Sequence, residues 1–165
     1  MDVSGKSVLV TGGGGGIGGG LAEAFSEKGA RVFVADIALD YAEAVAKQVG
    51  GTAIKLDVTS LESWAAAKAV TGDVDILCNN VGVSINFEPL EQISTEAFER
   101  VMAINVTGVY NGIHEFVPRI RRHGEGGHVV TTSSMSGILP TEGGGAGDLA
   151  IAGDGAQLFH DVAHA

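Results

Sequence analysis

The segment TGGGGGIGGG, residues 11–20, holds eight glycines in ten positions. It follows the apolar run SVLV at 7–10 and precedes a helical pattern over 17–28 that stops before Gly29. A glycine-rich turn between a strand and a helix lets backbone N–H groups approach a pyrophosphate, and the positive end of the helix dipole favours the anion. Because of this placement, the segment predicts a dinucleotide-binding turn and not a flexible linker.

The spacing of the glycines predicts a specific structural role for three of them. Gly12 opens the turn, Gly16 meets the phosphate, and Gly18 lies where the helix must come close to the sheet. Five glycines are surplus to this pattern: Gly13, Gly14, Gly15, Gly19 and Gly20. The last two fall within the first helical turns, where we expect each to destabilise the helix by up to about 1 kcal/mol relative to alanine.

Apolar, β-branched runs alternate with helical patterns along the chain. The runs predict strands at 7–10, 31–36, 52–58, 74–80 and 128–134. The helical patterns cover 17–28, 39–49, 60–70 and 95–121, and Thr59 with Glu62 forms a capping box before the third. This alternation predicts an α/β fold, a Rossmann-like doubly wound parallel sheet of about five strands in the order 3-2-1-4-5.

An acidic residue stands where a dinucleotide site needs one. Asp36 ends the second predicted strand, 18 residues beyond Gly18. A carboxylate there accepts hydrogen bonds from the hydroxyls of the adenosine ribose. It would repel a 2′-phosphate, and neither the glycine turn nor Ile37 supplies a compensating cation. The predicted cofactor is therefore NAD and not NADP.

Composition excludes several classes of partner and site. Apolar residues make up 45% of the chain, which indicates a globular domain. The net charge of −10 disfavours nucleic acid and anionic membranes as partners. Because Cys78 is the single cysteine, the chain cannot form an internal disulfide, which favours a reducing compartment. We expect Cys78 to be buried as a small apolar residue. With no apolar run long enough for a secretory signal or a membrane span, we expect a cytoplasmic protein.

Further motifs accompany the glycine turn. Asp57-Val58 ends the third predicted strand, and Asn79-Asn80-Val81-Gly82 ends the fourth. Together with the turn they resemble the classical short-chain dehydrogenase/reductase family over about residues 5–146. The resemblance implies hydride transfer between a nicotinamide and an alcohol or carbonyl. It also implies these cofactor contacts: Thr11, Gly12, Gly16, Ile17, Gly18, Asp36, Asp57, Val58, Asn80 and Gly82.

The same resemblance assigns catalytic positions, two of which are filled by unexpected residues. Ser134 matches the family's catalytic serine, and Asn105 matches the asparagine that holds a water in its proton relay. The family also needs a tyrosine and, four residues later, a lysine that lowers the pKa of the phenol. Alignment on Ser134 places Gly147 and Ile151 at these positions, so the chain is expected to be catalytically impaired.

Residues 147–165 differ in character from residues 1–146, which we interpret as the dinucleotide-binding domain. This tail is rich in glycine and lacks Lys, Arg and Tyr. It stands in place of the family's catalytic helix and its sixth and seventh strands, which would leave the edge of the fifth strand open unless the tail covers it. Two explanations stay open: a truncated or frame-altered product, which the abrupt change at Gly147 favours, and an evolved non-catalytic nucleotide binder.

Two other functions compete with an NAD-dependent oxidoreductase. One is a nucleotide-binding module without the chemistry. The other is a metal-dependent hydrolase, because His160 and His164 have the i, i+4 spacing of a zinc-binding helix in a weak helical pattern at Leu158, Phe159 and Val162. Glycines precede this pair at the end of the chain, so no metal site is expected. The resemblance also implies a homodimer through the helix Thr95–Arg121.

Overall fold

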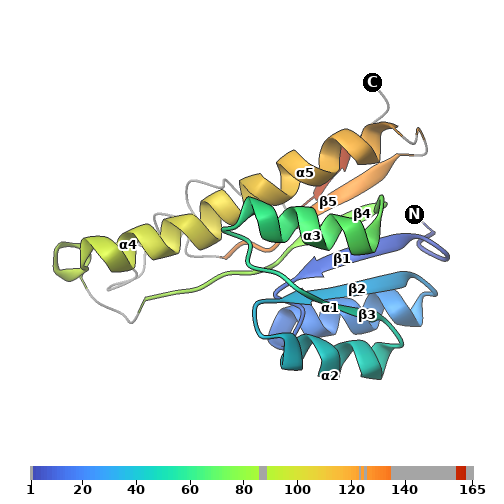
Figure 1. The fold of residues 1–165 in the computed structure, drawn as a ribbon, viewed down its shortest axis with the longest axis horizontal. Helices are drawn as coiled ribbons and strands as arrows, with labels where there is room; N and C mark the ends of the chain where they lie inside the picture. Colours follow the sequence, from blue (N-terminus) through green and yellow to red (C-terminus); the bar gives the residue numbers. More distant parts are fainter. Residues whose placement is uncertain (1, 86–88, 123, 125, 135–158, 163–165) are drawn as a thin grey trace.

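The computed structural model describes residues 2–85, 89–122, 124, 126–134 and 159–162 (Figure 1). Within them β-strands and helices alternate from the N-terminus, as the sequence predicts. The strands are β1 Ser7–Thr11, β2 Arg31–Asp36, β3 Thr52–Lys55, β4 Ile76–Asn79, β5 Gly127–Thr131 and β6 Phe159–Val162. The helices are α1 Gly16–Glu27, α2 Leu39–Val49, α3 Leu61–Thr71, α4 Thr95–Met102 and α5 Gly108–Arg122, with a 3-10 turn η1 at Leu90–Gln92.

Five parallel strands form the sheet in the order β3-β2-β1-β4-β5, so the predicted fold and strand order are confirmed. β1 lies at the centre, where Val8 is in register with Val32 of β2 and with Ile76 of β4. The strands are shorter than predicted at several ends. The third, for example, stops at Lys55, three residues before the end of the apolar run.

A sixth strand pairs antiparallel with β5, with Gly127 opposite Val162 and Val130 opposite Phe159. The helical pattern predicted at Phe159 and Val162 is therefore wrong, because the backbone there is extended; Leu158 lies outside the described residues. The edge of β5 offers unpaired N–H and C=O groups, and pairing with them outweighs a weak helical preference. This strand covers the edge that the sequence leaves open.

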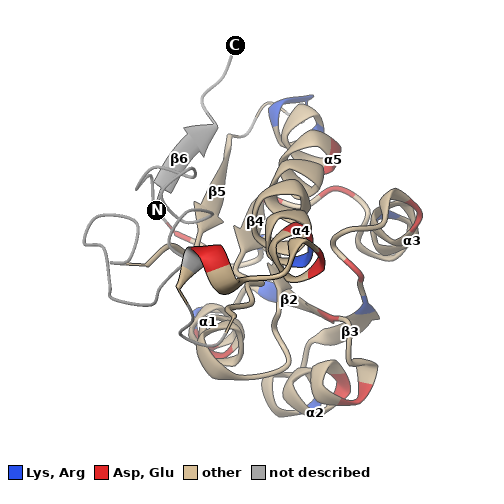
Figure 2. Ribbon diagram, turned by 90° about the vertical axis from the view of Figure 1, so that its left-hand side faces the viewer, with Lys and Arg blue, Asp and Glu red and all other residues tan. Residues whose placement is uncertain are grey.

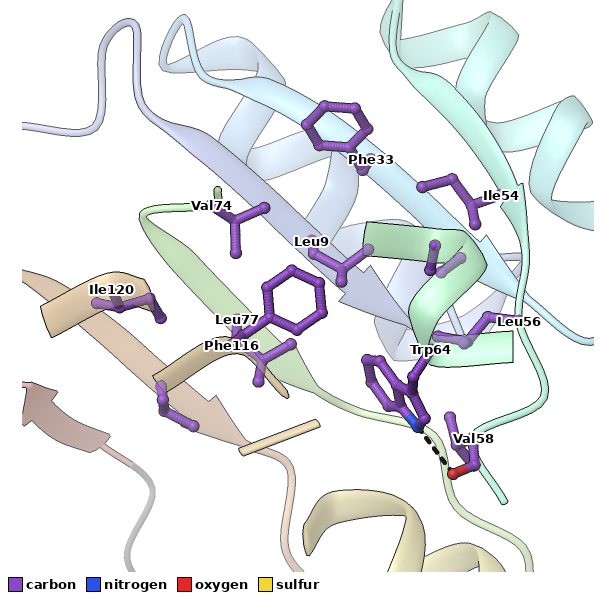
Figure 3. Packing of buried hydrophobic residues seen from close by; sticks show 13 residues of the cluster. Leu9, Phe33, Ile54, Leu56, Val58, Trp64, Val74, Leu77, Phe116 and Ile120 are labelled. Atoms are coloured by element: carbon purple, nitrogen blue, oxygen red, sulfur yellow. Dashed lines mark hydrogen bonds between the residues drawn. The ribbon is translucent and has the colours of Figure 1, made fainter. Parts of the chain in front are cut away.

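Helices cover both faces of the sheet, α1 and α2 on one and α3 and α5 on the other (Figures 1 and 2). Alternate residues of the strands point to the two faces, as in Val8 and Val10 toward α1 and Leu9 toward α3. On the α3 side Trp64 and Phe116 meet edge to face, with ring centroids 6.0 Å apart (Figure 3). The strands are apolar because both their faces are buried.

Two local details differ from the predicted helices. The N-cap of α3 is Ser60, whose Oγ accepts a hydrogen bond from Ser63 N, and not Thr59. Thr59 instead donates from N and Oγ1 to the carboxylate of Asp57, which removes it from the cap. The helix predicted over 95–121 is continuous but contains a π-helical turn, η2, at Ala103–Thr107 between α4 and α5.

At the amino end of the sheet an ion pair and hydrogen bonds join β1 to the start of β4. Asp75 Oδ2 accepts from Ser7 N at 2.7 Å and from Ser7 Oγ at 2.8 Å, and Lys6 Nζ lies 3.2 Å from Asp75 Oδ1. Burial by itself would raise the pKa of Asp75, but the hydrogen bonds from Ser7 and Lys6 outweigh it and hold the pKa below its ordinary value of 3.8. In the described part of the chain no helix has the length and apolar character needed to cross a membrane.

Candidate functional site

The carboxyl ends of the parallel strands meet at one edge of the sheet, and the turns that follow β1 and β4 border a cleft of about 570 Å³ there. The strand order reverses between β1 and β4, and open α/β sheets bind ligands at this point. Ten residues line the cleft: Gly12, Gly14, Gly15, Ile17, Asp36, Tyr41, Asn80, Val81, Gly82 and Thr132. Predicted cofactor contacts from three separate segments therefore come together in one place.

Each of the three assigned glycines has a physical reason to be glycine. Gly12 and Gly16 have φ angles of 61° and 54°, which residues with a Cβ rarely adopt. A Cβ at Gly18 would lie 2.1 Å from the carbonyl oxygen of Gly12, so the start of α1 packs directly on the turn. Ile17, 66% exposed, offers an apolar surface at the mouth of the cleft. The turn is therefore preformed, with its backbone at the cleft.

Gly13 and Gly14 are also needed, so the prediction that they are surplus is wrong. A Cβ at Gly13 would lie 2.8 Å from Val34 Cγ1, and one at Gly14 would lie 2.7 Å from Tyr41 Cβ. Both neighbours belong to β2 and α2, which the chain reaches only after α1. Three glycines are surplus, since a Cβ on them would meet no atom closer than 3.8 Å: Gly15, Gly19 and Gly20.

Thr11 and Asn80 tie the glycine turn to the end of β4. Thr11 Oγ1 donates to Cys78 O at 3.2 Å and accepts from Asn80 N at 3.0 Å and Val81 N at 3.2 Å. Asn80 Nδ2 donates to Thr11 O at 3.1 Å and to Gly12 O at 3.3 Å. Burial raises the pKa of the Cys78 thiol to about 12, as expected for an inert core residue. Thr11 and Asn80 therefore both support the glycine turn through hydrogen bonds.

Asp36 is held in a fixed position at the end of β2. Its Oδ2 accepts from Gly14 N at 3.0 Å, and its Oδ1 accepts from Ala38 N at 3.0 Å. The carboxylate lines the cleft beside the glycine turn and also a second cavity, of about 360 Å³, beyond β2. A carboxylate fixed by two N–H groups keeps its remaining acceptor positions for a ligand.

The second cavity is bordered by Asp57 and Val58, which are among the predicted cofactor contacts. The Val58 carbonyl accepts from Trp64 Nε1 at 2.9 Å, drawn in Figure 3, and from Asn111 Nδ2 at 3.0 Å. A Cβ at Gly108 would lie 2.7 Å from Val58 Cγ2, so α5 packs closely against this wall. The core thus fixes the wall of the cavity from behind.

Asn105 and Ser134 line a third cavity, of about 460 Å³, on the other side of the Asn80 segment. Asn105 Oδ1 accepts from Val83 N and its Nδ2 donates to Val83 O, both at 2.9 Å. The carboxamide therefore clamps the loop that follows β4. Its predicted role in holding a water stays a prediction, as does the catalytic role of Ser134.

Of the described residues that line this third cavity, none has a side chain that titrates near neutral pH. The last tyrosine and the last lysine of the sequence lie elsewhere. Tyr110 is exposed on α5 and stacks on His114, and Lys68 of α3 pairs with Glu115. Positions 147 and 151, where the motif would place the tyrosine and lysine, lie outside the described residues.

A family model described as short chain dehydrogenase matches residues 6–146. The chain belongs to this family. Members of the short-chain dehydrogenase family use NAD(P)(H) as cofactor and act on alcohols or carbonyls. The resemblance predicted from the motifs over about residues 5–146 is confirmed.

Several known proteins are similar to this chain. The C alpha-dehydrogenase of Sphingobium sp. is 33% identical over 84% of this chain and 48% of its own length. The sorbitol dehydrogenase of Cereibacter sphaeroides is 36% identical over 83% of this chain and 56% of its own. The chain therefore spans about half the length of these curated relatives.

Solved structures are similar over most of the chain. LigD from Sphingobium sp. in its apo form has a TM-score of 0.86 and 34% identity, covering 93% of this chain and 69% of the other. The 3-ketoacyl-(acyl-carrier-protein) reductase of Brucella melitensis, solved with NADH, has a TM-score of 0.87 and 28% identity, covering 92% and 66%.

Sequence analysis missed several residues that line these cavities, among them a tyrosine, an arginine and a threonine. Tyr41 of α2 lines the cleft beside Asp36, Arg100 of α4 lines the second cavity, and Thr132 follows β5 at the cleft. No local pattern indicates Tyr41 or Arg100, since each belongs to an amphipathic helix of ordinary composition. The position of Thr132, two residues before Ser134, was the available signal.

No group of three or more His, Cys, Asp and Glu side chains that could hold a metal ion occurs among the residues that the structure describes. The zinc-binding helix weighed for His160 and His164 is contradicted at its start, because the backbone of His160 belongs to β6. A strand does not place residues i and i+4 as a helix does. His164 lies outside the described residues.

Proposed function

We propose that this chain binds NAD(H) in the manner of its family, with the pyrophosphate on the glycine turn. The observation that supports the proposal is the preformed turn of Gly12, Gly16 and Gly18 beside Asp36, at the point where the strand order reverses. Ile17 and Gly82 would border the nicotinamide side of the cleft. Asp57 and Val58, with Thr11 and Asn80 as supports, would complete the set of cofactor-binding residues.

We propose NAD over NADP because of Asp36. Its carboxylate accepts two backbone hydrogen bonds, so it cannot turn away from a 2′-phosphate without losing them. Arg100 is the cation that lines the neighbouring cavity. It is exposed, and within the described residues nothing fixes its guanidinium by a hydrogen bond or an ion pair. A carboxylate in a fixed position should therefore dominate over an exposed cation that no other group holds in place.

We propose residues 1–146 as the dinucleotide-binding domain and residues 147–165 as a segment in place of the family's catalytic helix. Hydride transfer to or from an alcohol needs a group that exchanges a proton near neutral pH. Ser134 and Asn105 supply a hydroxyl and an amide, neither of which titrates in that range. We therefore expect hydride transfer to be impaired in this chain, so a non-catalytic nucleotide-binding module is the second candidate.

We also propose that a second copy of the chain pairs through the helix predicted at Thr95–Arg121. The apolar side chains of Val106, Tyr110 and Ile113 are exposed on one stripe of it, as their spacing by three and four residues requires. Light scattering after size exclusion measures the mass directly. A Tyr110→Glu variant should then be monomeric, and a parent chain that is monomeric at high concentration would refute the dimer.

Isothermal titration with NADH, NAD and NADP tests the cofactor. The expected result is saturable binding of NADH and NAD and weaker binding of NADP. Gly18→Ala serves as a control, because it displaces the turn and should weaken the binding. No binding of any dinucleotide refutes both candidate functions.

Formation of NADH from NAD with a panel of secondary alcohols then separates the two candidates. Turnover would contradict the expectation of impaired catalysis.

Reading the coding DNA beyond Ala146 in all three frames addresses the origin of residues 147–165. An out-of-frame Tyr-xxx-Lys motif there would identify a frame alteration.

A further inference from the structure

A chain of three side-chain hydrogen bonds connects the end of β5 to the glycine turn. Thr132 Oγ1 donates to Asn80 Oδ1 at 2.9 Å. The amide nitrogen of the same side chain, Asn80 Nδ2, donates to the carbonyls of Thr11 and Gly12 at 3.1 and 3.3 Å. The carboxamide of Asn80 therefore has its oxygen toward β5 and its nitrogen toward the turn.

The Asn80 carboxamide is in close contact with the glycine turn at the point where Gly12 and Gly18 pack against each other. A Cβ at Gly18 would lie 2.7 Å from Asn80 Nδ2 and 2.1 Å from Gly12 O. The amide nitrogen, the Gly12 carbonyl and the start of α1 thus touch one another. A rotation of the carboxamide would turn its oxygen toward two carbonyl oxygens or displace the turn, and either change costs hydrogen bonds.

The backbone of Thr132 is held independently of its hydroxyl. Thr132 N donates to Asn79 O at 2.9 Å, which continues the pairing of β5 with β4. Replacement of the hydroxyl by a methyl group should therefore leave the position of residue 132 unchanged. What it removes is the donor that holds Asn80 Oδ1.

We propose that Thr132 is a positioning residue for the cofactor, acting through Asn80 on the glycine turn. The hydroxyl of Thr132 fixes the carboxamide, and the carboxamide holds the Gly12 carbonyl in the conformation that presents the turn to the pyrophosphate. This inference rests on the proposed function only for its consequence in binding. It couples the segment after β5, which contains Ser134, to the turn that would hold the cofactor phosphates.

The test compares Thr132→Val, which keeps the shape and removes the hydroxyl, with Thr132→Ser, which keeps the hydroxyl. Thr71→Val is the matched control, because Thr71 Oγ1 also donates a hydrogen bond, to Gly72 O at 2.9 Å, but at the end of α3 that precedes β4. NADH affinity and the hydrogen exchange of the amides at 12–16 without ligand are measured for each. Gly13 N and Gly14 N are direct reporters, since they bond to Ala35 O and to the Asp36 carboxylate.

We expect Thr132→Val to bind NADH about three- to tenfold more weakly and to exchange the turn amides faster. Thr132→Ser and Thr71→Val should bind within about twofold of the parent chain. Unchanged affinity and exchange in Thr132→Val would overturn the proposal, and so would an equal loss of affinity in Thr71→Val, which would indicate general destabilisation. If the parent chain binds no NADH, the proposed function fails, and the exchange comparison alone decides the role of Thr132.

Discussion

The same substitution at two places in α1 should have opposite effects. Gly18→Ala and Gly20→Ala each add one methyl group, and each replaces a glycine inside the helix by the best helix former. At position 20 the new Cβ meets nothing within 4 Å, whereas at position 18 it would lie 2.1 Å from Gly12 O. The pair therefore separates helix propensity from the close approach of helix and turn.

The sizes of the two effects follow from these contacts. Gly20→Ala should stabilise the chain by about 0.5–1 kcal/mol, which corresponds to a rise in Tm of about 1–4 °C for a domain of this length. Gly18→Ala gains the same propensity, but the turn must retreat by roughly 1 Å, and such overpacking costs about 1–3 kcal/mol. We therefore expect a net loss of up to about 2 kcal/mol, with NADH affinity at least about tenfold weaker because the displaced turn carries the proposed phosphate site.

Urea unfolding followed by tryptophan fluorescence measures the stabilities. The chain has one tryptophan, Trp64, which is fully buried. Titration with NADH measures the affinities, and Gly20→Ala should bind as the parent does. The reasoning would be refuted if both variants changed stability in the same direction, or if Gly18→Ala bound NADH as tightly as the parent.

Three further predictions address charge and the thiol. Asp36→Asn should raise the affinity for NADP relative to NAD by about tenfold in parallel titrations, because a neutral amide no longer repels the 2′-phosphate; an unchanged ratio would place discrimination elsewhere. Asp75→Asn should lower the free energy of unfolding at pH 7 by about 1–2 kcal/mol, through weaker bonds from Ser7 and Lys6. Since the pKa of Asp75 is lowered on folding, this contribution is present above about pH 4 and is lost as the pH falls through the folded value, so parent and variant should converge in acid; a constant difference between pH 7 and pH 3 would contradict it. Because burial raises the pKa of Cys78 to about 12, iodoacetamide at pH 8 should label the chain only after unfolding, and rapid labelling of the folded chain would show an open core.

Local pattern was enough to predict most of the secondary structure. The strands are runs of apolar, β-branched residues because both faces of the sheet are covered by helices. The sequence pattern was less reliable at the ends of helices and strands, where a single residue decides where the element begins. Thr59 and Ser60 are both good caps, and the hydrogen bonds of Thr59 to Asp57 left the cap to Ser60.

The last strand shows a stronger limit. Phe159–Val162 has a weak helical pattern but pairs with β5. The unpaired edge of β5 offers hydrogen bonds to this segment, and the sequence of the segment does not reveal that the edge lies beside it. Such a choice depends on what lies beside the segment after folding.

The sequence by itself determined the family, the strand order and the position of the glycine turn, because these depend on glycine spacing and on periodicity over short stretches. The tertiary structure decided why Gly13 and Gly14 must be glycine, since their neighbours lie on β2 and α2. It alone joined Thr132 to Asn80, which are 52 residues apart in the chain. The physical reason is that a steric limit or a hydrogen bond acts over a few ångströms in space, and only the folded sheet brings the carboxyl ends of β1, β2, β4 and β5 within that distance.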